Sequence, residues 1–144
     1  MYRHILLPMD GSEVAVRAAR TGIDLAAVHG ARVTLLACSV PYASFEADAL
    51  LELQRSQYDE IARAAAARTL AAGEDYAKQK GVPATLEHLF AAHPHEAIVR
   101  TAGELGCDLI VMGTHGRRSL TATMLGSQTL KVLAHSSIPV LVCR

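Results

Sequence analysis

The sequence is poor in cysteine. Its three cysteines, Cys38, Cys107 and Cys143, are odd in number and widely separated. A disulfide framework or a zinc site needs cysteines in pairs at short, regular spacings. We therefore expect reduced thiols, as in a cytosolic protein, and we expect Cys143 to be a small apolar residue of the last strand.

The sequence also has no excess of charge and no long hydrophobic run. Fourteen Lys and Arg residues balance fourteen Asp and Glu residues, without blocks of like charge. Such a balance gives no electrostatic footprint for DNA, RNA or an anionic membrane. The first apolar run is broken by Pro8 and Asp10, too early for a signal peptide, and no stretch reaches the length of a membrane span. We expect a cytoplasmic protein with neither nucleic acid nor membrane as a partner.

Short apolar runs alternate with longer helical patterns along the whole chain. The β-like runs lie at residues 4–9, 32–40, 84–90, 108–113 and 139–143. Several of them are almost continuously apolar, which is typical of parallel strands covered on both faces. The pattern predicts the α/β class, with residues 1–144 forming a single domain: an open, five-stranded parallel sheet with helices on both faces.

Three of the predicted helices have recognisable ends. They span residues 12–29, 93–105 and 127–135. Ser12 and Ser127 stand where an N-cap is expected, and a glycine directly follows each of the first two helices. These boundaries place short connections between the helices and the strands that they join.

The segment from residue 44 to residue 80 is too long for one helix within a compact domain. Unbroken, it would extend about 55 Å at about 1.5 Å per residue, whereas a domain of this size has a radius of gyration near about 15 Å. We therefore expect a variable segment over residues 42–55, followed by a helix that ends at Lys80, before Gly81. That helix is expected to carry Ile61, Ala65, Leu70 and Tyr76.

Three glycines mark the segment "VMGTHGRRSLTATMLGSQTLKVL", residues 111–133. They lie between a predicted strand and a predicted helix, which places the connection at the carboxyl edge of a parallel sheet, where ligands bind in open α/β folds. Glycine lets an anion approach the main chain closely, and the helix that follows offers unpaired N–H groups to a phosphate. Ser127 and Thr129 would add hydroxyl donors, so this segment predicts a phosphate site.

The spacing of these glycines excludes two common phosphate motifs. A Walker loop needs a lysine directly after its last glycine, where Ser127 stands; Lys131 lies a full turn further on. The GxGxxG fingerprint places its glycines after the first strand. The spacing here is G-x2-G-x9-G-[S/T], which runs from Gly113 through Gly116 to Gly126 and Ser127.

This motif and its place in the chain resemble the universal stress protein family, on the branch that carries the motif for ATP binding. The resemblance covers nearly the whole chain. "ILLPMDGSE" is similar to the family's first strand and turn, "VTLLACSV" to its second strand, "DLIVMGTHGR" to its fourth, and "GSQTLKVLAHSSIPVLVC" to its last helix and strand. It implies strand order 3-2-1-4-5, a Rossmann-like adenine nucleotide-binding fold, and a homodimer formed through the apolar C-terminal edge strand.

The resemblance also implies an ATP site across the carboxyl ends of strands one, two and four. Pro8 and Asp10 would flank the adenosine, and the main chain at Cys38 would meet the adenine edge. The residues implied along the ribose and the phosphates are Met112, Gly113, Gly116, Gly126, Ser127, Gln128 and Thr129. Two of these positions depart from the family: Cys38 stands where an apolar residue is common, and Gln128 where a small apolar residue is common.

The function that the resemblance implies is ATP binding by a stress-response protein, with the nucleotide acting as a signal or a conformational ligand. Mg²⁺ would arrive with the nucleotide, and Asp10 is the carboxylate that can be placed near it. The sequence offers no Walker lysine and no paired carboxylates beside the glycine segment. No residue is assigned as catalytic, and ATP hydrolysis should be slow at most.

Two other functions are compatible with the sequence. The first is a nucleotide-independent stress scaffold or interaction protein, and the second is a hydrolase or nucleotidyl-transfer enzyme on the same fold. ADP or another adenine nucleotide can also take the place of ATP as the cellular ligand.

Several candidate residues have a structural interpretation beside the functional one. Residues 10–12 form a common turn followed by a cap. Arg117 and Arg118 would either pair with phosphate or solvate a loop. His115 would be a general base, but no neighbour in the sequence is expected to orient it.

Three histidines, His88, His93 and His95, lie close together in the sequence and suggest a metal site. However, a His-Pro-His segment fits the entry of a helix better, because proline is favoured at the first helical position. No metal site is assigned.

Overall fold

Strands and helices alternate throughout the chain. The computed structural model describes residues 1–42, 49–115 and 125–144, and within them it contains five strands and four helices. The elements are β1 (His4–Pro8), α1 (Glu13–His29), β2 (Arg32–Ser39), α2 (Ala49–Lys80), β3 (Ala84–Phe90), α3 (Pro94–Glu104), β4 (Leu109–Gly113), α4 (Ser127–His135) and β5 (Val140–Cys143). All five predicted strands are confirmed, each to within a residue at either end.

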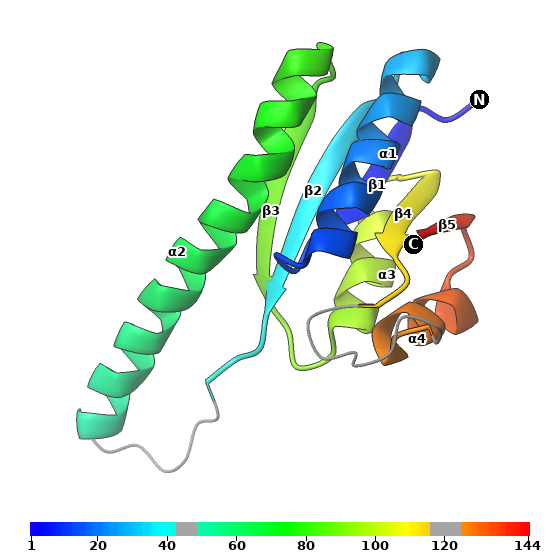
Figure 1. Cartoon of the computed structure of the whole chain (residues 1–144). Helices are drawn as coiled ribbons and strands as arrows, with labels where there is room; N and C mark the ends of the chain where they lie inside the picture. The colour runs from blue at the N-terminus through cyan, green and yellow to red at the C-terminus, as the bar shows by residue number, and fades with distance from the viewer. Residues whose placement is uncertain (43–48, 116–124) are drawn as a thin grey trace.

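The strands form one parallel sheet in the order β3-β2-β1-β4-β5 (Figure 1). This confirms the fold and the strand order that the resemblance implies. In the register, Ile5 of β1 is level with Val33 of β2 on one side and with Leu109 of β4 on the other. The three central strands therefore end together at one edge of the sheet.

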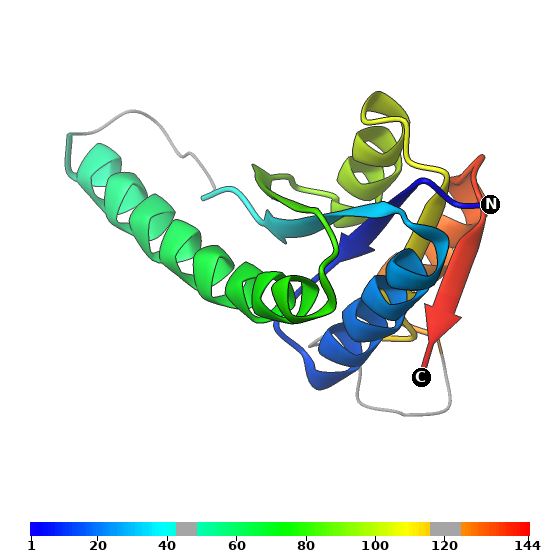
Figure 2. The same cartoon turned by 90° about the horizontal axis from the view of Figure 1, so that it is seen from above.

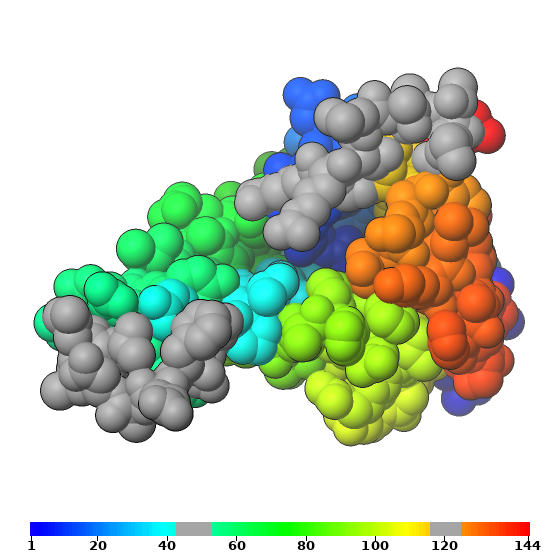
Figure 3. Space-filling view, turned by 90° about the horizontal axis from the view of Figure 1, so that it is seen from below, coloured from blue at the N-terminus to red at the C-terminus, as the bar shows by residue number. Residues whose placement is uncertain are grey.

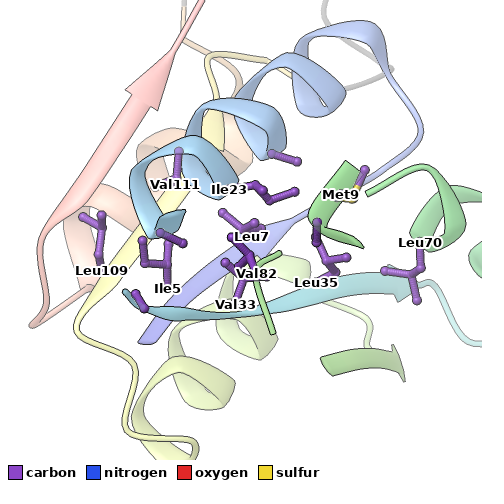
Figure 4. Packing of buried hydrophobic residues seen from close by; sticks show 14 of the residues in the cluster. Ile5, Leu7, Met9, Ile23, Val33, Leu35, Leu70, Val82, Leu109 and Val111 are labelled. Carbon is purple, nitrogen blue, oxygen red and sulfur yellow. The ribbon is translucent and has the colours of Figure 1, made fainter. Parts of the chain in front are cut away.

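Helices cover both faces of the sheet, and each face has its own apolar core. On one face, Ile5 and Leu7 of β1 pack with residues from α1 and α2, as the close view in Figure 4 shows. On the other face, Leu6 packs with Ile98 of α3 and Val132 of α4. Successive residues of a strand point to opposite faces, so an unbroken apolar strand fills both cores. Figure 2 shows the two helix layers on either side of the sheet.

The ends of α1 follow from its sequence. Ser12 is the N-cap, as predicted, and its hydroxyl oxygen accepts the N–H of Ala15 at 3.2 Å. The helix ends at Gly30, which has a φ of 65° and donates its N–H to the carbonyl of Ala26. A residue with a side chain would be strained in that left-handed conformation, whereas glycine is not.

The long helix α2 differs from the prediction. It begins at Ala49, so the expected variable segment over residues 42–55 is wrong for residues 49–55; residues 43–48 lie outside the described residues. At 32 residues it extends about 48 Å, and its N-terminal half projects beyond the sheet (Figures 1 and 2). The prediction failed because it required the whole helix to stay within the compact domain.

Among the side chains of α2 that the structure describes, the buried ones lie in its C-terminal half. Ala66, Leu70 and Ala77 are buried against the sheet and α1, whereas Ile61, which was expected on the same helix, is 69 % exposed. A Cβ at Gly73 would lie 2.9 Å from both Leu35 Cδ2 and Met9 Sδ, so small residues allow the close approach. In the described residues, none of the helices has the length and apolar character required to cross a membrane.

Candidate functional site

The carboxyl edge of the sheet brings together the ends of β1 and β4 and the start of α4. The chain leaves β1 through α1 to reach β2, while β4 lies on the other side of β1. This change of direction creates a crevice at the carboxyl ends of the strands, the usual ligand site in open α/β sheets. Figure 3 looks onto this edge and shows a hollow between α3, α4 and the end of β2, with blue atoms of the N-terminal segment at its base.

The turn after β1 is held by Asp10. Its carboxylate oxygen Oδ1 accepts the backbone N–H of Ser12 at 2.9 Å and the hydroxyl of Ser12 at 2.6 Å. Gly11 between them has a φ of 83°, a conformation that glycine adopts without strain. The structural interpretation of this turn, in which Asp10 fixes the cap of α1, is therefore confirmed. Asp10 is exposed and remains a predicted nucleotide contact.

The start of α4 differs by one residue from the prediction. Gly126 is the N-cap and Ser127 is the first helical residue, so the prediction of Ser127 as the cap is wrong. Gly126 donates its N–H to the carbonyl of Thr114, just after β4, and accepts the N–H of Leu130. The first of these hydrogen bonds holds the helix start directly against the end of β4, and the second begins the helix.

The first turn of α4 has no cap of the usual kind. No side-chain hydrogen bond caps Gly126 in the described structure, and the first turn contains no acidic residue. The first N–H groups of a helix have no acceptor within it, and they carry the positive end of the helix dipole. The exposed Ser127 stands at this end. An anion such as phosphate would complete the helix start.

Thr129 uses its hydroxyl inside the protein. The side chain is 3 % exposed, and its Oγ1 donates to the carbonyl of Gly113 at 2.9 Å. This hydroxyl was expected to donate to a phosphate, but its hydrogen is already committed. Only the main-chain N–H of Thr129 is oriented with the helix start.

The side chain of Gln128 is bonded to α3. Its side-chain oxygen Oε1 accepts the backbone N–H of His95, in the first turn of α3, at 3.0 Å. The same oxygen lies 3.2 Å from Nδ1 of the His95 ring. No local pattern in the sequence predicts this contact, because the two residues are 33 positions apart.

Three other predicted contacts, Met112, Gly113 and Pro8, lie on the strands β4 and β1. Met112 is buried between the sheet and the helices α3 and α4. Gly113 approaches α1, since a Cβ on it would lie 3.1 Å from a methyl group of Val14. Pro8 ends β1 and is half-buried. Any ligand contact of Met112 or Gly113 would therefore be made by the main chain.

Cys38 lies near the end of β2 and is half-buried. Burial raises the pKa of its thiol to about 11, against a smaller opposing effect of Arg100. The side chain packs against the core beneath α3 and α4. The sulfur is thus a protonated, apolar group at neutral pH. The contact of the main chain at Cys38 with adenine, which the resemblance implies, stays a prediction.

The histidines are placed differently from one another. His115 has an orienting neighbour after all, because its Nδ1 lies 3.0 Å from the hydroxyl of Thr114. His88 lies on β3, where its Nε2 is 2.8 Å from the hydroxyl of Ser39. His93 is the N-cap residue of α3, ahead of Pro94, which confirms the predicted helix entry. Among the described residues, no three His, Cys, Asp or Glu side chains are grouped to hold a metal ion.

Three residues singled out in the sequence, Gly116, Arg117 and Arg118, lie in residues 116–124, outside the described residues.

Two hollows elsewhere are distinct from the crevice. One of about 460 Å³ lies at the amino edge of the sheet, with Arg3 and Arg32 in its wall. Another of about 310 Å³ lies between α1 and α2. The first is remote from the glycine motif and has no part in the candidate site.

Comparison with known proteins points to one family over the full length of the chain. A family model described as "Universal stress protein family" matches residues 1–144. The Thermus aquaticus "Universal stress protein in QAH/OAS sulfhydrylase 3'region" is 35% identical over 144 residues, which cover 100% of both chains. Universal stress protein MJ0531 of Methanocaldococcus jannaschii is 32% identical over 146 residues, covering 100% of this chain and 83% of that protein.

Solved structures show the same fold. Universal stress protein UspA from Lactobacillus plantarum matches with a TM-score of 0.84 and 26% identity, covering 99% of this chain and 98% of the other. A universal stress protein in complex with cAMP matches with a TM-score of 0.72 and 24% identity, covering 98% and 95%. One from Archaeoglobus fulgidus in complex with dAMP matches with a TM-score of 0.70 and 20% identity, covering 99% and 98%.

Proposed function

The chain belongs to the universal stress protein family, and on that premise we propose that it binds an adenine nucleotide, ATP, at the carboxyl edge of its sheet. The observation that carries the proposal is the start of α4. Gly126 holds the helix start against the end of β4, where the strand order changes direction, and within the described part of the chain no side chain caps it. The complexes of fold relatives with cAMP and dAMP support an adenine nucleotide as the class of ligand.

In the proposed site, the phosphates lie at the start of α4 and the adenosine lies over the ends of β1 and β2. Main-chain N–H groups of Ser127, Gln128 and Thr129 bind the phosphates, and the hydroxyl of Ser127 adds a donor. Gly113 and Gly126 leave room for close packing of the chain beside the anion, and Gly116 is proposed as a further phosphate contact. Pro8 and Asp10 flank the adenosine, and the main chain at Cys38 and Met112 borders the base and the ribose.

Mg²⁺ accompanies the nucleotide in this proposal. The ion takes most of its ligands from phosphate oxygens and water, with one or two carboxylates from the protein. Asp10 fits this role, since it is an exposed carboxylate directly after β1. It would hold the ion while keeping the turn to Ser12.

The nucleotide acts as a signal or a conformational ligand. Lys131 is exposed and a full turn into α4, away from the position of a Walker lysine. Hydrolysis of ATP is therefore at most slow. We also propose that the protein is a cytoplasmic homodimer formed through β5. This strand is an edge of the sheet, and Leu141 on it is 37 % exposed. Sedimentation tests the interface: the wild type should be a dimer and a Leu141→Lys variant a monomer.

Titration of the purified protein with ATP and with adenosine tests the ligand. We expect ATP to bind more tightly than adenosine, because in the proposed site most hydrogen bonds between protein and nucleotide are made to the phosphates, which adenosine lacks. Mass analysis of nucleotides that copurify with the protein identifies which adenine nucleotide is bound in the cell. A dissociation constant of about 1 mM corresponds to a binding free energy of only about −4 kcal/mol. Absence of ATP binding at that concentration would refute the proposal and leave the nucleotide-independent scaffold as the function.

A further inference from the structure

Gln128 and His95 join the starts of two helices. His95 is the second residue of α3 and Gln128 the second residue of α4. The side-chain oxygen of Gln128 accepts the backbone N–H of His95 at 3.0 Å and lies 3.2 Å from its ring Nδ1. A backbone N–H can only donate, so the carbonyl end of the Gln128 amide must face it. Nδ1 of His95 must then carry a hydrogen and donate to the same oxygen.

This contact supplies a cap that α3 lacks. The N-cap residue His93 makes no side-chain hydrogen bond to the first turn of the helix in the described structure. The N–H of His95 has no acceptor inside the helix, as is general for the first turn. Gln128 satisfies it from the neighbouring helix, and His95 is only 9 % exposed, so water competes weakly for the bond.

The first turn of α4 is consequently fixed on two sides. Thr129 ties it to β4 through the carbonyl of Gly113, and Gln128 ties it to α3 through His95. The main-chain N–H groups of this turn are the ones that the proposed function assigns to the phosphates. Hydrogen bonds weaken steeply with misalignment, so the strength of such a site depends on how firmly the turn is held.

We infer that the side chains of Gln128 and His95 position the nucleotide site: they orient the first turn of α4 toward the phosphates without contacting the ligand themselves. The inference rests on the proposed function. It gives the Gln128 side chain a role beyond the one that the resemblance implies, which names Gln128 among the residues along the phosphates.

The surroundings of the pair determine how it is tested. The His95 ring lies 6.0 Å from the His93 ring and 5.7 Å from the His135 ring, and its Nε2 is 4.0 Å from a carboxylate oxygen of Glu96. Protonation of these histidines would alter the local charge. The binding measurements are therefore made at one pH of about 8, above the range in which histidine usually titrates.

A double-mutant cycle with ATP separates positioning from direct contact. We expect Gln128→Ala to weaken ATP binding about threefold to tenfold, up to the cost of a lost helix cap. His95→Phe should weaken it less, since the backbone N–H at 95 still donates to Gln128. The ATP affinity of the double variant should match that of Gln128→Ala to within about twofold, because both substitutions act on the same contact.

If the double variant loses ATP affinity by the product of the two single-variant losses, Gln128 acts independently of His95, and the inference is overturned. Unchanged affinity in Gln128→Ala would overturn it too. A wild type that binds no ATP would instead refute the proposed function, and this inference with it. Adenosine, which lacks phosphate, should bind all four proteins alike; a loss of adenosine affinity that parallels that of ATP would contradict a role at the phosphate end.

Asp108 provides a matched control at the opposite edge of the sheet. Its carboxylate accepts the backbone N–H groups of Arg3 at 2.9 Å and His4 at 3.1 Å. Asp108→Ala also removes a side chain that accepts two hydrogen bonds, and it should leave ATP affinity unchanged. An equal loss of affinity in this variant would mean that general loosening, and not the position of α4, explains the effect of Gln128→Ala.

A measurement without nucleotide tests the contact itself. Nitrogen NMR of the His95 ring should show the neutral tautomer that carries its hydrogen on Nδ1, because Gln128 presents an acceptor there. Gln128→Ala should release that preference. A wild-type His95 with its hydrogen on Nε2 would overturn the inference whether or not ATP binds.

Discussion

Gly126 lies so close to His115 that a Cβ at position 126 would be 2.9 Å from the His115 Cα. The same glycine donates its N–H to the carbonyl of Thr114. Both contacts are with main-chain atoms, which cannot move aside by a change of rotamer. The last glycine of the motif is therefore required by the packing of α4 on the end of β4, before any ligand is considered.

Substitution of Gly126 should consequently affect stability as well as binding. We expect Gly126→Ala to lower the free energy of unfolding by about 1–3 kcal/mol, the usual cost of overpacking, as measured by urea denaturation. Gly103 is the control, because it lies in α3 with nothing within 4 Å of an added Cβ. Gly103→Ala should stabilise the protein by about 0.4–1 kcal/mol. Equal stability of Gly126→Ala and wild type would contradict the close approach.

Ser127 allows the charge at the start of α4 to be tested at an exposed position. It is exposed and is the first residue of the helix. We expect Ser127→Asp to raise the free energy of unfolding by about 0.3–1 kcal/mol through the helix dipole, and to weaken ATP binding at least about tenfold through repulsion of the phosphates. Unfolding in urea and titration with ATP measure the two effects.

The opposite signs of these effects distinguish a phosphate site from a merely structural helix start. Asparagine has a size similar to that of aspartate and no charge. Ser127→Asn should therefore change the free energy of unfolding and the ATP affinity only slightly. Adenosine should bind Ser127→Asp and wild type alike. Stronger or unchanged ATP binding in Ser127→Asp would contradict the assignment of the phosphates to α4.

The fold could be predicted from the sequence because its signals are local. Each strand is a short apolar run, and the caps of α1 at Ser12 and Gly30 have the residue types that those positions require. The extent of α2 could not be predicted in the same way. Its Ala-rich sequence favours helix regardless of packing, and whether Ile61 faces a core or solvent depends on how far the sheet extends beneath the helix.

The place of the candidate site was predictable, but the roles of its side chains were not. The glycine spacing located the connection between β4 and α4. Thr129 bonds to Gly113, 16 positions away, and Gln128 bonds to His95, 33 positions away. Such contacts depend on the tertiary arrangement of three elements. By contrast, the partner of His115 is its neighbour Thr114, and its hydroxyl was a signal that the sequence already contained.

The cysteines report on the adenine end of the site. Burial raises the pKa of both Cys38 and Cys107 to about 11, so only about one thiol in a thousand is ionised at a pH of about 8. We expect both to react slowly with a thiol reagent such as DTNB in the native protein and rapidly after unfolding in urea. The rates can be assigned with Cys38→Ser and Cys107→Ser variants.

Saturating ATP should slow the labelling of Cys38 further, since the proposed adenine contact is made by the main chain of that residue. Cys107 is the matched control, because it follows α3 near the amino edge of the sheet and has a similarly raised pKa. Its rate should not change. Protection of Cys107 but not of Cys38 would place the nucleotide at the wrong edge and contradict the proposed site.

His4 should make the protein less stable in mild acid. It is 6 % exposed, and its Nε2 lies 2.8 Å from the hydroxyl of Thr34. Burial, with a contribution from Arg32, lowers the pKa of His4 below its ordinary value of 6.5, although the carbonyl of Leu105 and the charge of Asp108 oppose the shift. The unfolded chain therefore binds a proton at a higher pH than the native protein does.

The sign follows from this difference. Above a pH of 6.5 the contribution of neutral His4 to stability is fully present, and it is lost as the pH falls from 6.5 through the lower pKa of the native state. The slope is at most about 1.4 kcal/mol per pH unit. Urea denaturation between a pH of about 7.5 and about 5 measures this slope.

His88 contributes to the pH dependence in the same direction, because burial and then Arg63 lower its pKa too. Each histidine must therefore be replaced separately. His4→Gln should reduce the pH dependence of stability while leaving the part due to His88, and His88→Gln should do the reverse. An unchanged slope in His4→Gln would show that His4 is not held neutral by its burial beside Thr34.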